Sequence, residues 1–84
     1  MPVIGRFYSI IIKMHYIEGE HNPPHIHAYY NEYEGIFDIR TGNLVRGRLP
    51  DKIIGLVQLF INQFKERLLE MWEKQNFELL KFGE

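Results

Sequence analysis

Apolar and polar residues alternate along the first half of the chain, a pattern typical of strands that bury one face. Within residues 7–16, the even-numbered positions are apolar or aromatic: Tyr8, Ile10, Ile12, Met14 and Tyr16. We therefore predict a strand over Phe7–Tyr16. A loop over Ile17–Pro24 should follow it, because Gly19 and the Asn-Pro-Pro step disfavour regular structure.

Three shorter strands are predicted next, over His25–Tyr30, Glu34–Arg40 and Leu44–Leu49. A short turn over Asn31–Tyr33 joins the first two. Thr41-Gly42-Asn43 joins the last two, since glycine and asparagine tolerate positive φ. The four predicted strands form an antiparallel meander.

The second half of the chain changes to a helical period. Pro50 suits the first turn of a helix, where its missing N–H costs nothing, and Asp51 complements the helix dipole. Apolar residues then recur at helical spacing: Ile53, Ile54, Val57, Phe60, Ile61, Phe64, Leu68 and Trp72. The pattern persists to about Phe77. A bend near Asn62 would divide it, so one long helix and two shorter helices both fit.

The predicted fold is α+β, a four-stranded antiparallel meander with one long or two shorter C-terminal helices packed on one face. With 84 residues, of which 45% are hydrophobic and 14% aromatic, the chain forms a single domain over residues 1–84. The helical stripe, Trp72 included, is interpreted as core. The apolar tail either packs back on the sheet or meets a partner: Phe77, Leu79, Leu80 and Phe82.

Composition narrows the functional classes. The net charge is −1, so nucleic-acid binding would depend on a local basic patch. The absence of cysteine removes disulfides and cysteine-ligated zinc, and it fits a reducing compartment. The N-terminus lacks the pattern of a signal peptide, and the longest apolar run is far too short to cross a bilayer. We therefore expect a cytoplasmic protein.

Strand parity gathers polar side chains on the sheet face away from the helices. Ile26, Ala28 and Tyr30 are expected to face the helices, and Val45, Gly47 and Leu49 to face inward with them. The other face then receives side chains from three strands, His25, His27, Tyr29, Asp38, Arg40, Leu44, Arg46 and Arg48, with Lys13 and His15 as further members. A slip of one residue would invert this assignment.

The run His21-Asn22-Pro23-Pro24-His25-Ile26-His27 holds three of the four histidines around a Pro-Pro step. Histidine titrates near physiological pH and is the commonest metal ligand. Proline fixes its own φ and pushes the preceding residue toward extended conformations, so this backbone is stiff. The run therefore marks a candidate site, for which three interpretations stay open.

In the first interpretation, His25 and His27 are the general acid and base of a metal-independent ribonuclease, and Arg46 or Arg48 stabilises charge on the phosphate. In the second, the three histidines of the run, His21, His25 and His27, bind a divalent transition metal with Asp38 or Glu34 as a carboxylate ligand. In the third, Asn22 caps the turn and the histidines hydrogen-bond to loop backbone and nearby carboxylates.

Two further residues have ordinary structural interpretations. Arg6 would pair with Glu18 or Glu20 near the loop. His15 would be a solvent-facing strand residue.

Several segments resemble one bacterial family of small proteins, the domain of unknown function 4160. They are Pro2-x-Ile4-x-Arg6-Phe7-Tyr8-x-Ile10, His21-Asn22-Pro23-Pro24-His25-Ile26-His27-Ala28, Gly47-Arg48-Leu49-Pro50 and Leu69-x-x-Trp72. The resemblance covers nearly the whole chain. It departs from the family pattern at Ile26, where members often have phenylalanine, and in the loop Ile17–Glu20. It assigns no catalytic residue.

The resemblance implies a toxin-like component of a two-gene module, with a small cognate partner protein encoded nearby and RNA as a target. The leading hypothesis is therefore a toxin-like protein that acts on RNA. Its candidate catalytic residues are His25, His27 and Arg48, and its candidate binding residues are Arg6, His21, Asn22 and Arg46. The alternative is a metal-binding or protein-interaction domain without catalysis. An enzyme would need the histidine-bearing face open and cationic.

Overall fold

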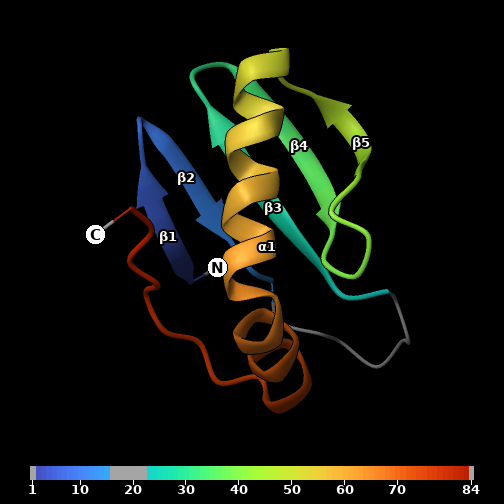
Figure 1. The fold of residues 1–84 in the computed structure, drawn as a ribbon, viewed down its shortest axis with the longest axis vertical. Helices are drawn as coiled ribbons and strands as arrows, with labels where there is room; N and C mark the ends of the chain where they lie inside the picture. Colours follow the sequence, from blue (N-terminus) through green and yellow to red (C-terminus); the bar gives the residue numbers. More distant parts are fainter. Residues whose placement is uncertain (1, 16–22, 84) are drawn as a thin grey trace.

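The computed structural model describes residues 2–15 and 23–83. Within them, five strands precede one helix (Figure 1): β1 Val3–Phe7, β2 Ile10–Lys13, β3 His25–Tyr30, β4 Tyr33–Asp38, β5 Leu44–Arg48 and α1 Asp51–Lys74. The strands form one antiparallel sheet in chain order. The α+β class and the antiparallel meander are confirmed, but the described part of the sheet has five strands where four were predicted.

The prediction of one strand over Phe7–Tyr16 is wrong, because the turn of a hairpin lies inside that range. β1 and β2 are joined at Tyr8 and Ser9, whose φ angles of 48° and 64° form a two-residue turn. Such turns are normally signalled by glycine or asparagine, and neither is present here. The alternation of apolar residues therefore continues through the turn without marking it. Tyr16 lies outside the described residues.

The later strands agree closely with their predictions. β3 has the predicted bounds, whereas β4 ends at Asp38 and not at Arg40. Asp38 starts the turn, because its Oδ1 accepts the backbone N–H groups of Arg40 at 2.7 Å and Thr41 at 3.3 Å. Arg40 was predicted to lie on the outer sheet face, and this prediction is wrong, because Arg40 belongs to the exposed turn.

Of the two alternatives, one long helix or two shorter helices, the structure has one helix, α1, with a kink. It begins at Asp51, so Pro50 is the N-cap residue, one position before the first turn in which it was predicted to lie. Phe64 has non-helical angles (φ −111°, ψ 19°), which places the kink two residues after Asn62. Gln75 adopts the left-handed conformation, with φ 54°, and ends the helix before the predicted limit at Phe77.

The core lies between α1 and one face of the sheet. Its fully buried members include Ile10, Ile12, Ile26, Ala28, Phe37 and Ile39 from the sheet side and Val57, Phe60 and Leu68 from the helix. The Phe60 ring stacks on Phe7, with centroids 5.1 Å apart. The stripe is thus confirmed as core, although Ile54, Phe64 and Trp72 are only partly buried. No helix within the described residues is long and apolar enough to span a membrane.

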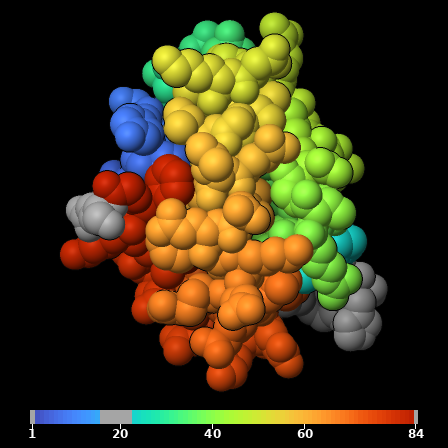
Figure 2. All heavy atoms as spheres, in the orientation of Figure 1, coloured from blue at the N-terminus to red at the C-terminus, as the bar shows by residue number. Residues whose placement is uncertain are grey.

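The C-terminal tail packs back on the sheet, which was one of the two alternatives. Leu80 forms a parallel bridge to Gly5, and its N–H donates to the Ile4 carbonyl at 2.8 Å. Phe82 packs on Phe7, with centroids 4.7 Å apart. Figure 2 shows α1 across the middle of this face, with the tail on the β1 side and β5 on the other.

Phe60→Ala should destabilise the protein by about 3–5 kcal/mol, because it leaves a cavity at a fully buried aromatic site. Chemical denaturation followed by circular dichroism measures this change. Leu59→Ala is the matched control, since Leu59 is the preceding residue on the helix and is 58% exposed. A loss below about 1 kcal/mol for Phe60→Ala would contradict the assigned core.

Gly47→Ala should destabilise much more than Gly42→Ala. Both glycines have positive φ, 85° and 77°, so alanine is strained at both. At Gly47, however, the added Cβ would lie 2.2 Å from the Glu34 carbonyl oxygen, whereas at Gly42 nothing lies within 4 Å. Thermal melts of the two variants measure the difference. Equal melting temperatures would contradict the close approach of β5 to β4.

Candidate functional site

The strand register places the side chains of the sheet face opposite α1 in rows. One row crosses β2 to β5 and consists of Lys13, His27, Ile36 and Arg46. The next row crosses β1 to β5 and consists of Arg6, Ile11, Tyr29, Glu34 and Arg48. His25 lies opposite Asp38. We call the following set the histidine face: Lys13, His15, His25, His27, Tyr29, Glu34, Ile36, Arg46 and Arg48. The predicted parity of β3 is confirmed, because Ile26 and Ala28 are fully buried on the helix side.

On β5 the predicted outward direction is right for Arg46 and Arg48, but the predicted parity is wrong for Leu44 and Val45. Phe37 pairs with Leu44 and Ile36 pairs with Arg46, which leaves Val45 as the extra residue of a bulge. Leu44 therefore packs against the core, and Val45 is 60% exposed.

His27 is held by a carboxylate on the neighbouring strand. Its Nδ1 lies 3.3 Å from Oε2 of Glu34, so Nδ1–H donates to the carboxylate. A histidine that donates through Nδ1 presents Nε2 as its free nitrogen. The ring is nearly buried, and a fixed, partly dehydrated imidazole of this kind is suited to accepting a proton.

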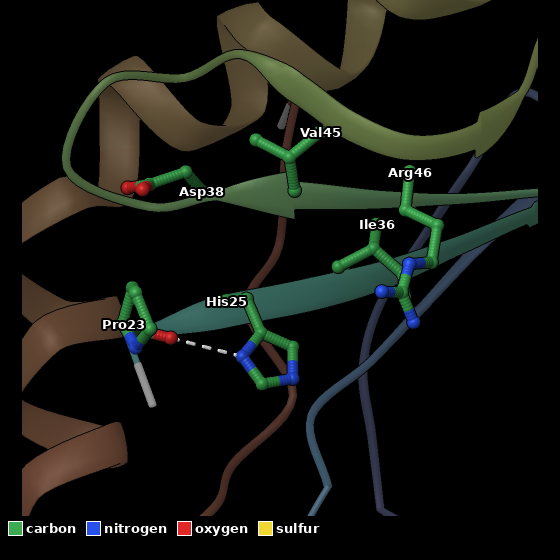
Figure 3. A pocket seen from close by; sticks show the side chains of 6 residues that line it. All are labelled: Pro23, His25, Ile36, Asp38, Val45 and Arg46. Carbon is green, nitrogen blue, oxygen red and sulfur yellow. Dashed lines mark hydrogen bonds between the residues drawn. The ribbon is translucent and has the colours of Figure 1, made fainter. Parts of the chain in front are cut away.

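His25 is held through the same nitrogen, by the proline motif. Its Nδ1–H donates to the Pro23 carbonyl at 2.9 Å (Figure 3). The next carbonyl, of Pro24, accepts the backbone N–H of Ile39 at 2.9 Å, which ties the Pro-Pro step to the end of β4. The Trp72 ring of α1 also contacts His25, with centroids 4.8 Å apart. The stiff motif thus orients one histidine and presents its Nε2.

His15 is a third imidazole at this site, and the prediction of an ordinary solvent-facing residue is wrong. Its ring centroid lies 3.7 Å from that of His27, closer than the 5.4 Å between His25 and His27. Its Nε2 is buried and makes no hydrogen bond within the described part of the chain. The available signal was parity, because His15 follows Lys13 by two residues and Lys13 pairs with His27.

Burial and neighbouring charges alter the titration of this cluster. Burial lowers the pKa of His27, with a smaller lowering from His25, while the hydrogen bond to Glu34 opposes the change. Burial also lowers the pKa of His15, helped by repulsion from His27 and His25. The pKa of the Tyr29 hydroxyl is raised by burial and by Glu34. His15 and His27 are therefore mainly neutral at pH 7.

Arg46 is a cation that shares a pocket with His25. The two side chains line an open pocket of about 470 Å³, together with Pro23, Ile36, Asp38 and Val45. In Figure 3, Arg46 extends over Ile36 to the side of the sheet where the His25 ring lies. Arg48 stands in the next row, opposite Glu34, so Arg46 is better placed than Arg48 to act with His25.

The remaining predicted residues are placed as follows. Arg6 lies on β1 opposite Ile11, on the same sheet face. His21, Asn22, Glu18 and Glu20 lie outside the described residues, so their predicted roles stay predictions. Within residues 2–15 and 23–83, no group of three or more His, Cys, Asp and Glu side chains is placed to hold a metal.

The fold and this face define a small α+β protein with one antiparallel sheet, a single covering helix and histidines on the opposite sheet face. A family model described as domain of unknown function (DUF4160) matches residues 9–73, from the turn before β2 almost to the end of α1. The chain belongs to this family. The match includes the histidine face and leaves out β1 and the tail. Neither a curated protein nor a solved structure matches the chain.

Acidification should destabilise the protein as the pH falls through the ordinary histidine pKa of 6.5. The native pKa values of His15 and His27 are lowered, so the unfolded state takes up protons first and is favoured in acid. Urea denaturation at pH 7.5 and pH 5.5 measures the loss. His15→Phe, which keeps an aromatic ring but does not titrate, should lose less. An equal loss of unfolding free energy in the wild type and in His15→Phe would contradict a role for His15 in this pH dependence.

Proposed function

We propose that the histidine face cleaves RNA without a metal, by attack of a ribose 2′-hydroxyl on the adjacent phosphate. The observation that carries this proposal is the matched anchoring of two neighbouring histidines. His25 and His27 each donate through Nδ1, to a carbonyl and a carboxylate, and each therefore has Nε2 free for proton transfer. Cleavage of this type needs two such groups and a cation near the phosphate.

His27 is suited to the role of general base. Burial lowers its pKa, so the ring is neutral at pH 7, and Glu34 stabilises the cation that forms when the ring accepts a proton. In the proposed step, Nε2 of His27 takes the 2′-hydroxyl proton as O2′ forms a bond to phosphorus. The bond from phosphorus to O5′ breaks, and protonated His25 gives its Nε2 proton to O5′. The products are a 2′,3′-cyclic phosphate and a 5′-hydroxyl.

Arg46 suits the role of phosphate cation, which the sequence hypothesis gave first to Arg48. It lines the same pocket as His25, whereas Arg48 faces Glu34 across the strand pair. A guanidinium can donate two parallel hydrogen bonds to phosphate oxygens, and their strength grows as charge develops. Arg48 and Lys13 then serve flanking phosphates on the same face.

The toxin-like role and a cognate partner protein belong to the same proposal. Both come from the family resemblance, and the arrangement of the histidine face is compatible with them. A partner that covers this face would block the phosphate site directly. The partner would then act by occlusion, without any change in the fold.

Purified protein should cleave single-stranded RNA with a bell-shaped pH profile and should be insensitive to EDTA, because one imidazole must be neutral and one protonated. His25→Ala and His27→Ala should each lower the rate by about 10²–10⁴-fold. Arg46→Ala should also lower it, and Arg40→Ala is the matched control, because Arg40 lies in the exposed turn.

An oligonucleotide with a 2′-deoxyribose at the cleavage site should not be cleaved, since it lacks the attacking hydroxyl. Circular dichroism shows whether each variant is folded. Unchanged cleavage in both histidine variants would refute the acid–base roles. Loss of activity in EDTA would favour the metal-binding alternative.

A further inference from the structure

The pocket beside His25 has two chemically different sides. Pro23, Ile36 and Val45 supply apolar surface, and His25 and Arg46 supply hydrogen-bond donors. Val45 is 60% exposed because the β5 bulge turns it away from the core. An exposed apolar side chain next to a cation and an imidazole fits a ligand that is itself part apolar and part anionic.

Asp38 also lines this pocket, and its charge would repel an anion if it pointed inward. Its carboxylate is instead engaged by the turn after β4, where Oδ1 accepts the N–H groups of Arg40 and Thr41 at 2.7 and 3.3 Å. Figure 3 shows this carboxylate directed away from His25 and Arg46. The interior of the pocket is therefore left to the donors of those two residues.

We propose that the pocket seats one nucleotide, the one whose 2′-hydroxyl attacks in the proposed cleavage. This inference rests on the proposed function and adds a subsite to it. The base packs on Val45, Ile36 and Pro23, and the 3′-phosphate lies against Arg46 and His25. A volume of about 470 Å³ is adequate for one nucleotide, since small-ligand pockets span about 300–1,000 Å³.

The two sides of the pocket contribute differently to binding. The donors of Arg46 and His25 bind any phosphate. The apolar side binds only a ligand that carries a base, since packing the base on these aliphatic side chains removes apolar surface from water. A nucleoside 3′-monophosphate should therefore bind more tightly than inorganic phosphate or a free nucleoside. These simple ligands test the subsite without any cleavage.

Calorimetric titration of the full chain with uridine 3′-monophosphate, adenosine 3′-monophosphate, uridine and inorganic phosphate is the test. At least one 3′-monophosphate should bind about tenfold or more tightly than phosphate, a difference of about 1.4 kcal/mol that comes from burial of apolar surface of the base. The single tryptophan, Trp72, packs against His25 with centroids 4.8 Å apart, so its fluorescence should change on binding and locate the ligand.

Val45→Ser should reduce the nucleotide affinity several-fold and leave phosphate binding unchanged, because it removes only apolar surface. Val45→Thr provides a second, nearly isosteric variant that keeps strand preference. Leu79→Ser is the matched control, an exposed apolar residue (52%) on the tail. Arg46→Ala should weaken nucleotide and phosphate alike.

Two results would overturn the subsite. They are nucleotides that bind no more tightly than phosphate, and nucleotide affinity that is equal in wild type and both Val45 variants. Nucleotide binding as expected, without RNA cleavage, would leave the subsite in place and refute the proposed function. Cleavage that does not depend on Val45, with no nucleotide binding, would refute the subsite alone.

Discussion

The contact between the Phe60 ring and the backbone at Gly5 sets how closely α1 approaches the sheet. A Cβ on Gly5 would lie 3.0 Å from two carbons of that ring, so glycine is what allows the contact. Phe7, Phe64 and Phe82 surround the same ring, with centroids 5.1 to 5.8 Å away. The helix, β1 and the C-terminal tail therefore all contact one side chain, that of Phe60. Because strand side chains alternate, fixing the buried face also fixes which residues form the histidine face.

The two edge strands of the sheet, β1 and β5, are protected in different ways from pairing with another sheet. On β1, the tail supplies Leu80 as a parallel partner, so this edge is covered. On β5, the bulge at Val45 and the positive φ of Gly47 (85°) interrupt a regular ladder, and two arginines project from the strand. Irregular and charged edges resist pairing with another sheet. The same bulge that interrupts this edge exposes Val45 beside His25.

The histidine face holds two of its imidazole rings in fixed orientations, and it also contains a buried polar atom that lowers the stability of the fold. Pro23 and Glu34 hold His25 and His27 through Nδ1, so neither ring needs to reorganise when Nε2 acts. His15 packs closely against His27, and its buried Nε2 has no hydrogen-bond partner among the described residues. A buried polar atom without a hydrogen bond is unfavourable, and such atoms are few in folded proteins.

The sequence by itself determined the features that depend on local periodicity. The alternation in His25–Tyr30 predicted β3 with its bounds and the outward direction of His25 and His27. The stripe after Pro50 predicted the helix and its buried face. Resemblance in the proline-histidine run also indicated the family that the match to residues 9–73 then showed.

Only the tertiary structure decided the Tyr8–Ser9 hairpin, the exposure of Val45 and the close contact between the rings of His15 and His27. Each of these depends on cross-strand register, which hydrogen bonds set between residues distant in sequence. A single bulge shifts that register without changing the apolar pattern. The choice of Arg46 over Arg48 beside His25 has the same origin.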